Sequence, residues 1–237
     1  MKNNTFKPKQ YRRQDISKKL QTAGFYPLDV MVTGVTGAGK STTLNTLFHK
    51  QVAEVGEGCD PMTMTLDSYS LHDKLRFWDT PGLGDGVQQD IEHSKKMIDL
   101  LHKTYTMDNN TYGFIDMVII VIEGSNRDMG STYQLINDII LNNIEPQRVM
   151  IAINKADIAM KGRGWDHKNK QPLPILTQFL EQQAQSIQKR IIDACGLQIQ
   201  KPIYYSADQF FNIQAVMDQM INTMPESRRQ LILPQCA

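Results

Sequence analysis

One eight-residue segment limits the possible folds of this chain more than any other part of it. Residues 34–41 read G-V-T-G-A-G-K-S and match G-x-x-x-x-G-K-[ST], the pattern of a phosphate-binding loop, or P-loop. The apolar residues 28–32 before it predict a buried strand, and residues 42–48 after it carry apolar side chains at helical spacing. A loop between a strand and a helix directs backbone N–H groups toward phosphate oxygens. The segment therefore predicts a nucleoside triphosphate site.

Each residue type in this loop suits a role in phosphate binding. Lys40 is expected to reach the β- and γ-phosphates, and the Ser41 hydroxyl is expected to bind Mg²⁺. The small residues let the backbone come close to the phosphates. The residues expected to contact the nucleotide here are Gly34, Thr36, Gly37, Ala38, Gly39, Lys40, Ser41 and Thr42.

A second motif indicates which base is bound. Residues 149–153 predict another buried strand, which leads directly into Asn154-Lys155-Ala156-Asp157. The Asp157 carboxylate can accept two hydrogen bonds from guanine, whereas adenine has no such pair of donors on that edge. The Lys155 stem is expected to lie against the base, and Asn154 is expected to tie this loop to the P-loop. The motif predicts guanine selectivity.

A third motif, D-T-P-G at residues 79–82, ends the strand predicted at residues 74–78. Asp79 is expected to hold Mg²⁺ through water, as an outer ligand. The Gly82 N–H is expected to contact the γ-phosphate, since glycine lets the backbone pass that close.

The ordered set of motifs resembles the translation-factor class of P-loop GTPases. Within that class the chain is similar to bacterial Era-related and to septin- and AIG-like GTPases, including ribosome-binding GTPase-type proteins. The resemblance runs from about residue 29 to residue 224 and implies Mg²⁺-dependent hydrolysis of GTP to GDP. It also implies that Ser206 and Ala207 lie at the base, with the Ala207 N–H near guanine O6. Asp208 departs from the lysine usual in the family.

The same resemblance implies a threonine in switch I, the segment at residues 51–65. Thr63 and Thr65 are the candidates for binding Mg²⁺ and the γ-phosphate, and Thr63 is favoured because Thr65 enters the following strand. The alternative is that both residues only begin that strand.

Leu83 occupies the position at which many small GTPases carry a water-orienting glutamine. Catalysis is then expected from Lys40, Gly82 and Thr63, with slow intrinsic turnover. The resemblance to septin-like proteins suggests a homodimer across the nucleotide face, in which Arg127 approaches the partner's phosphates. An ordinary surface turn at Arg127 is the alternative. A GTP-binding assembly module with negligible hydrolysis is a second possible function.

Charge is uneven along the 237 residues, although the net charge is only +1. Residues 1–20 contain seven Lys or Arg and one acid, about +6, which leaves about −5 for the rest. Such an arm can bind RNA, including ribosomal RNA, or an anionic membrane, or it can be a solvated terminus. Within it, residues 15–23 are expected to form a short helix.

The longest apolar run, residues 117–122, is too short to span a membrane. Three cysteines without metal-ligand spacing favour a cytoplasmic protein.

Alternating apolar strands and helices predict an α/β fold of the P-loop NTPase type. The expected architecture is a three-layer sandwich, in which a mostly parallel six-stranded sheet with one antiparallel edge strand has helices on both faces. The expected organisation is a basic N-terminal arm (1–27), a GTPase domain (28–224) with an insertion at 158–173, and a tail (225–237).

Two further segments are not explained by these motifs. Residues 104–113 are expected to form a surface loop. Trp165, in the insertion, is either an anchor for a partner protein or the small core of its own loop.

Overall fold

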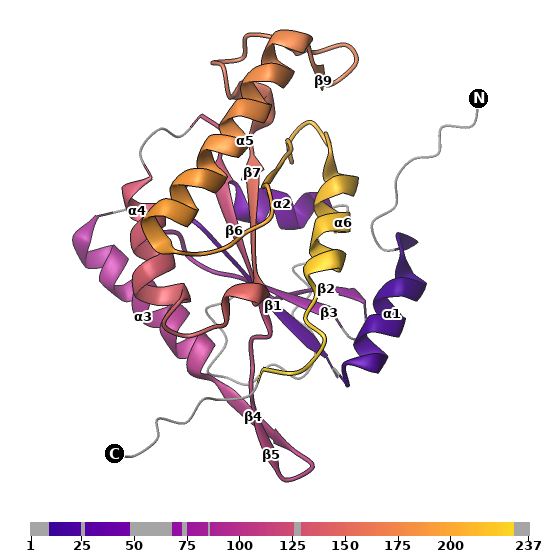
Figure 1. Ribbon diagram of the computed structural model, residues 1–237, viewed down its shortest axis with the longest axis vertical. Helices are drawn as coiled ribbons and strands as arrows, with labels where there is room; N and C mark the ends of the chain where they lie inside the picture. The colour runs from indigo at the N-terminus through magenta and orange to yellow at the C-terminus, as the bar shows by residue number, and fades with distance from the viewer. Residues whose placement is uncertain are drawn as a thin grey trace.

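The computed structural model describes residues 10–24, 27–47, 68–72, 75–84, 86–125 and 129–229. Its centre is a six-stranded sheet with the strand order β10-β7-β6-β1-β3-β2 (Figure 1). Five strands run parallel, and only the edge strand β2 pairs antiparallel. This confirms the predicted sheet. Along the sheet the strands are β10 (Ile203–Tyr204), β7 (Val149–Asn154), β6 (Met117–Glu123), β1 (Leu28–Thr33), β3 (Leu75–Asp79) and β2 (Ser68–His72).

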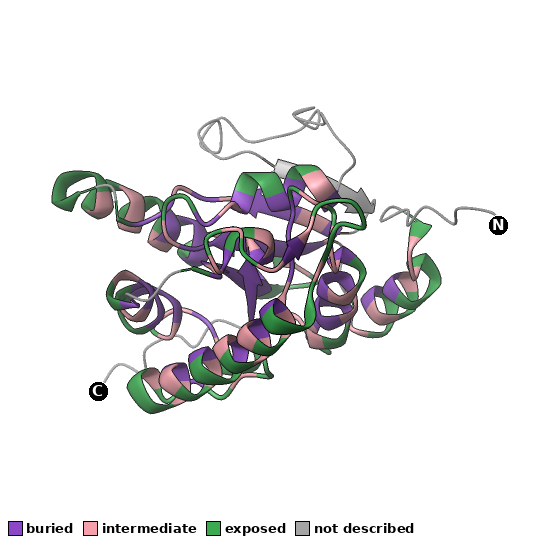
Figure 2. Cartoon of the chain, turned by 90° about the horizontal axis from the view of Figure 1, so that it is seen from above, coloured by how far each residue is buried: buried purple, intermediate pink, exposed green. Residues whose placement is uncertain are grey.

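The three central strands are buried because both faces of the sheet are covered. Every residue of β1 and β7 is buried, as is all of β6 except its last residue. This burial explains their continuous apolar sequences, since a strand that contacts helices on both faces has no polar side. Figure 2 shows the buried residues gathered in the sheet and on the inner sides of the helices.

Two groups of helices cover the two faces (Figure 1). One face packs against α1 (Arg13–Thr22), α2 (Lys40–Leu47) and α6 (Ile213–Thr223), and the other packs against α3 (Val87–His102), α4 (Gly130–Gln134) and α5 (Pro174–Cys195). A π-helical segment, η3 (Leu135–Ile140), continues α4, and the short 3₁₀ turns η4 (Pro146–Arg148) and η5 (Ala156–Ile158) flank β7. The sandwich has the three layers that the sequence predicts.

The helix expected in the basic arm is present as α1. Ile16 and Leu20 are buried in the core, four residues apart on one side of the helix. The Tyr11 hydroxyl and the Arg12 guanidinium both bond the Asp218 carboxylate on α6, at 2.9 and 2.8 Å. This part of the N-terminal arm is therefore docked on the domain.

Residues 104–113 form a hairpin, so the expectation of a surface loop is wrong. Strands β4 (Thr104–Met107) and β5 (Asn110–Gly113) pair antiparallel around Asp108 and Asn109, which both have positive φ. Asp and Asn accept this left-handed conformation better than most residues, so they suit a two-residue hairpin turn. Arg228 lies over the rings of Tyr105 and Tyr112, at 5.9 and 5.0 Å from their centres. The hairpin is thus held by a residue far away in sequence.

The insertion forms its own small core around Trp165. Strands β8 (Trp165–Asp166) and β9 (Gln171–Pro172) make a short hairpin, and Trp165 is only 6% exposed. Its ring meets Phe211 edge-on, with the centres 5.5 Å apart. A side chain buried in this way cannot be an exposed anchor, so the second interpretation of Trp165 is the correct one.

The first residues of the expected tail belong to the packed domain. Arg229 is buried, and its backbone N–H bonds the Asp116 carboxylate at 3.2 Å. Arg148 donates hydrogen bonds to the carbonyl groups of Asp116 and Ser227, at 3.2 and 3.0 Å. Burial raises the pKa of Asp116 to about 7, because the charged carboxylate is removed from water. Two arginines therefore fasten the chain at residues 225–229 to the base of the sheet.

Candidate nucleotide-binding site

The predicted motifs gather at one edge of the sheet, the carboxyl ends of its parallel strands. The P-loop follows β1, the D-T-P-G motif follows β3, and the N-K-A-D motif follows β7. Ser206 and Ala207 follow β10. Open α/β sheets bind their ligands at this edge, because the loops after parallel strands converge there. The fold thus assembles one site from four segments that are distant in sequence.

The P-loop curves around the start of α2. Gly39 has a φ of +87°, and a Cβ at this position would collide with the Nδ2 atom of Asn154. The Lys40 side chain is buried and donates hydrogen bonds to the carbonyl groups of Gly34 and Val35, at 3.4 and 3.3 Å. The ammonium group therefore already lies over the loop, where phosphates bind in this motif.

Two of the three residues predicted to hold a metal ion, Ser41 and Asp79, are in direct contact. The Ser41 hydroxyl donates a 2.5 Å hydrogen bond to an Asp79 carboxylate oxygen. Among the described residues no group of three or more His, Cys, Asp or Glu side chains could hold a metal ion by itself. A hydroxyl beside a carboxylate suits Mg²⁺, which keeps several waters and takes further oxygen ligands from phosphates. The Ser41–Asp79 pair fits that role.

The segment after D-T-P-G lies directly against the P-loop. A Cβ on Gly82 would come within 2.5 Å of the Thr36 nitrogen, so only glycine fits there. The Thr36 N–H donates a 2.8 Å bond to the Leu83 carbonyl, and Val35 and Leu83 form a parallel β-bridge. The Leu83 side chain is 3% exposed and packs into the core. Leu83 therefore cannot orient a water molecule through its side chain.

Asn154 joins three parts of the site. Its Nδ2 donates to the carbonyl groups of Ala38 and Gly39, at 3.0 and 3.4 Å, and its Oδ1 accepts the Ala207 N–H at 3.0 Å. The residue is 2% exposed, so these bonds satisfy an amide that would otherwise be buried without partners. The tie that the sequence suggests between N-K-A-D and the P-loop is therefore present.

The other base-contact candidates differ in burial. Lys155 has a φ of +62° and pairs with Glu123 at 3.0 Å. Burial opposes ionisation of Glu123, but hydrogen bonds from Ser125 and Lys155 outweigh it and lower the pKa of Glu123. Asp157 is half-buried in the turn after β7. Ser206 is fully buried, and its hydroxyl oxygen accepts the Gln209 N–H at 3.1 Å.

Sequence reasoning missed a supporting layer behind the P-loop. The Thr43 hydroxyl donates a 2.7 Å bond to the Gly39 carbonyl and lies 2.8 Å from the Tyr205 hydroxyl. Burial raises the pKa of Tyr205, so this phenol stays protonated. Thr43 was detectable, because a threonine four residues after Gly39 can bond back to that carbonyl in a helix. Tyr205 had no such local signal.

Three predicted residues lie outside the described part of the chain. These are the switch I candidates Thr63 and Thr65, and Arg127. Their proposed roles remain predictions.

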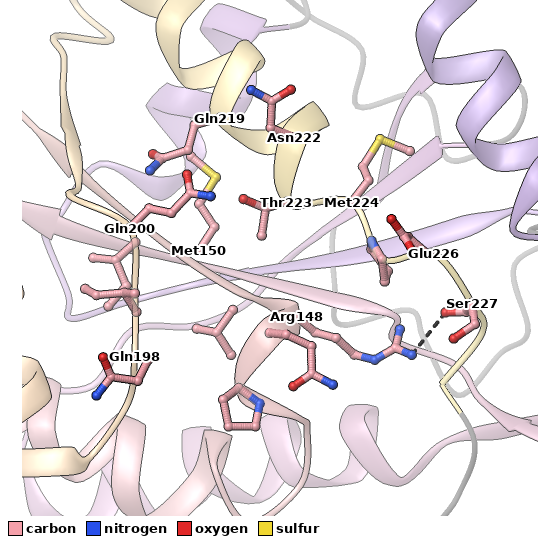
Figure 3. Close-up of a pocket in the computed structure, with 16 residues that line it drawn as sticks. Arg148, Met150, Gln198, Gln200, Gln219, Asn222, Thr223, Met224, Glu226 and Ser227 are labelled. Carbon is pink, nitrogen blue, oxygen red and sulfur yellow. Dashed lines mark hydrogen bonds between the residues drawn. The ribbon is translucent and has the colours of Figure 1, made fainter.

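A cavity of about 510 Å³ lies at the opposite end of β7 from the N-K-A-D motif (Figure 3). Its walls are the first residues of β7, the chain at residues 198–200, the end of α6 and residues 225–227. Arg148 crosses one side and bonds the Ser227 carbonyl. None of the nucleotide motifs contributes to this cavity.

Comparison with known families identifies the domain. A family model described as "50S ribosome-binding GTPase" matches residues 29–155, more than half of the chain. The chain belongs to this GTPase family. The matched region runs from β1 through the P-loop and the D-T-P-G motif to Lys155, so it contains most of the site described above.

Curated relatives match over shorter regions. Neuronal-specific septin-3 from Danio rerio is 36% identical over 89 residues, which is 32% of this chain and 24% of the septin. T-cell-specific guanine nucleotide triphosphate-binding protein 2 from Mus musculus is 41% identical over 75 residues, 29% of this chain and 18% of the relative. The chain therefore spans about a quarter or less of the length of these relatives.

Solved structures match the whole fold of this GTPase domain. Toc33 from Arabidopsis thaliana, in complex with GDP and Mg²⁺, superposes with a TM-score of 0.59 and 16% identity, covering 93% of both chains. The LeoA bacterial dynamin GTPase from ETEC gives a TM-score of 0.56 and 13% identity, over 89% of this chain and 38% of LeoA. At these identities the likeness establishes the fold.

Among the described residues, no helix is long and apolar enough to cross a membrane.

Proposed function

We propose that this chain binds GTP together with Mg²⁺ and hydrolyses it to GDP and phosphate, as a molecular switch. The observation that carries the proposal is the Asn154 amide, which joins the phosphate-binding loop to the two base-recognition segments. A site built in this way holds the phosphates and the base of a nucleotide in fixed relative positions. Family membership supports GTP as the nucleotide, and the Ser41–Asp79 pair supports Mg²⁺ as the ion bound with it.

Base selection is assigned to Asp157. Asp157 comes three residues after the anchored Asn154, in the turn that follows β7, so the start of that turn is fixed to the P-loop. A nucleotide without the two guanine donors would leave this carboxylate desolvated and unpaired. Lys155 supports the base through its stem while its ammonium pairs with Glu123.

Phosphate chemistry is assigned to the backbone and to Lys40. Lys40 stabilises negative charge that develops on the phosphates, and the Gly82 N–H contacts the γ-phosphate. Thr63 is proposed to position the attacking water through its backbone. Because the Leu83 side chain packs into the core, no glutamine-like group acts at that position, and intrinsic turnover is expected to be slow.

A second copy of the chain is proposed as the source of the missing catalytic group. The proposal rests on the septin relatives and on Toc33, for which a dimerisation-deficient variant has been crystallised. In the sequence, Arg127 comes four residues after Glu123, the last residue of β6. In a dimer across the nucleotide face, this arginine would approach the partner's phosphates.

Single-turnover hydrolysis tests the proposed function directly. Protein in excess over radiolabelled GTP should convert it to GDP and phosphate in the presence of Mg²⁺, and Lys40→Ala should abolish this conversion. Thr106→Ala, in the hairpin at the other end of the domain, is the matched control and should keep the wild-type rate. If GTP is bound but not converted over hours, the chain is a nucleotide-binding assembly module instead.

A further inference from the structure

Residues 82–84, which begin at the glycine of the D-T-P-G motif, are held from two sides. On one side the Thr36 N–H of the P-loop bonds the Leu83 carbonyl at 2.8 Å. On the other side, the Nδ1 atom of His93 lies 2.6 Å from the Gly82 carbonyl oxygen. The Gly84 N–H donates a 2.8 Å bond to the Asp90 carboxylate. Three consecutive residues are thus fixed by contacts with two different elements.

The two contacts on the second side come from one face of α3. Asp90 and His93 are three residues apart, so their side chains point in the same direction from the first turns of the helix. A carbonyl oxygen can only accept a hydrogen bond, so the Nδ1 atom of His93 must carry the proton. The contact thereby fixes the tautomer of the ring as well as the direction of the Gly82 carbonyl.

We propose that His93 is a positioning residue that holds Gly82 against the P-loop for recognition of the γ-phosphate. This inference rests on the proposed function, in which the Gly82 N–H contacts that phosphate. Gly82 packs so tightly against Thr36 that a Cβ would not fit. A small rotation about the backbone bonds of Gly82 changes the direction of its N–H. His93 bonds the carbonyl on the other side of the same Cα, so it restricts the backbone torsions of Gly82 before the nucleotide arrives.

The contribution of His93 to nucleotide affinity is specific for the triphosphate. GDP has no γ-phosphate, so its affinity does not depend on the position of Gly82. GTP and its non-hydrolysable analogue GMPPNP do contact Gly82, and they benefit from a backbone that is already oriented. A purely structural role of His93 would instead change both affinities equally or lower stability alone. His93 is only half-buried, so its removal leaves no large cavity in the core.

The experiment compares His93→Ala with His93→Asn. The Asn side-chain amide places a donor close to the position of the His Nδ1 atom, so it restores the bond to Gly82, whereas Ala cannot. The measured quantity is the ratio of the dissociation constants for GMPPNP and GDP, by calorimetry with Mg²⁺. His102→Ala is the matched control, because this second histidine of α3 contacts Asn143 at the far end of the helix.

His93→Ala should raise the ratio about 2- to 10-fold, the range for one hydrogen bond of about 0.5–1.5 kcal/mol. In His93→Asn the ratio should lie close to the wild-type value. His102→Ala should leave the ratio unchanged. An unchanged ratio in His93→Ala, or an Asn variant as impaired as the Ala variant, overturns the proposal. If the wild type binds neither nucleotide, the proposed function fails instead.

A measurement on the wild type covers the case in which a variant does not fold. Nitrogen chemical shifts of the His93 ring should report a proton on Nδ1 in the nucleotide-free protein and in the GMPPNP complex. An Nδ1 atom without a proton in both states would overturn the contact with Gly82, whether or not any variant is stable.

Discussion

The hydroxyl of Ser41 and the carboxylate of Asp79 are joined by a 2.5 Å hydrogen bond between the first turn of α2 and the end of β3. The two residues come from motifs 38 positions apart in the chain. Parallel pairing of β1 with β3 brings the ends of the two strands side by side and so makes the contact possible. The bond brings together the two oxygen donors that the proposed function assigns to Mg²⁺.

Removing the Ser41 hydroxyl should therefore uncouple nucleotide binding from Mg²⁺. In Ser41→Ala, GTP affinity measured with Mg²⁺ should fall at least about tenfold, or 1.4 kcal/mol, because a metal ligand is lost. Affinity measured in EDTA should change much less. Calorimetry under both conditions checks this, with Thr106→Ala as a hydroxyl-deletion control. An equal loss with and without Mg²⁺ would contradict the assignment of Ser41 to the metal.

Truncating Asn154 should weaken both the fold and the site. Asn154→Ala leaves the buried N–H of Ala207 and the carbonyl groups of Ala38 and Gly39 without their partner. The free energy of unfolding should fall by about 1–3 kcal/mol, and GTP and GDP should lose affinity together. Urea denaturation and nucleotide titration measure the two effects. Asn142→Ala is the control. It removes an exposed hydrogen bond to the Asp138 carbonyl and should lower the free energy of unfolding by less than about 0.5 kcal/mol.

Stability should decrease as pH rises from about 4 to about 7, because of Asp116. Its pKa is raised by burial from 3.8 to about 7 in the folded protein. Between these values the folded state keeps a proton that the unfolded state has released, so raising the pH favours unfolding. The expected loss is a few kcal/mol, at about 1.4 kcal/mol per pKa unit. Asp116→Asn keeps an oxygen acceptor for the Arg229 N–H.

Urea unfolding at about pH 5 and about pH 8 measures this dependence. The difference between wild type and Asp116→Asn should grow with pH, with the variant relatively more stable at pH 8. Parallel pH curves for the two proteins would show that Asp116 is ionised throughout, with its charge compensated by the nearby arginines.

Dimerisation should accelerate hydrolysis if Arg127 acts on the partner's phosphates. The rate per molecule should rise with protein concentration, and Arg127→Ala should remove that rise without weakening GTP binding. An arginine supplied in this way contributes about 10³–10⁵ in the best cases, and a weak dimer far less. Initial rates over a range of concentrations, with light scattering in GDP and GMPPNP, check this. A constant rate per molecule and a monomer in both nucleotides would point to an external activator instead.

The sequence predicted the sheet, its helices and the three nucleotide motifs because their signals are local. The apolar runs of β1, β6 and β7 reflect burial on both faces, and each motif is a short string at the end of one strand. Asn154 was also predictable, because a buried amide after β7 can reach the P-loop.

The parts that were missed depend on contacts between distant residues. The half-buried face of the hairpin at residues 104–113 carries Tyr105, Met107 and Tyr112, and Arg228, which lies over the two tyrosines, is more than 110 positions away. The bond between Arg229 and Asp116 likewise spans 113 positions. Trp165 could not be assigned because its neighbour Phe211 belongs to another part of the chain. The His93–Gly82 contact requires the direction of α3, which a sequence pattern does not give.

Base selection by Asp157 tests the central claim most directly. Titration of the wild type with GTP, ATP and xanthosine triphosphate should show clear preference for GTP. Asp157→Asn should weaken GTP binding by roughly 2–5 kcal/mol and admit xanthosine triphosphate, whose base presents an acceptor where guanine presents a donor. Equal affinity of the wild type for GTP and ATP would contradict the assignment of this site to guanine nucleotides.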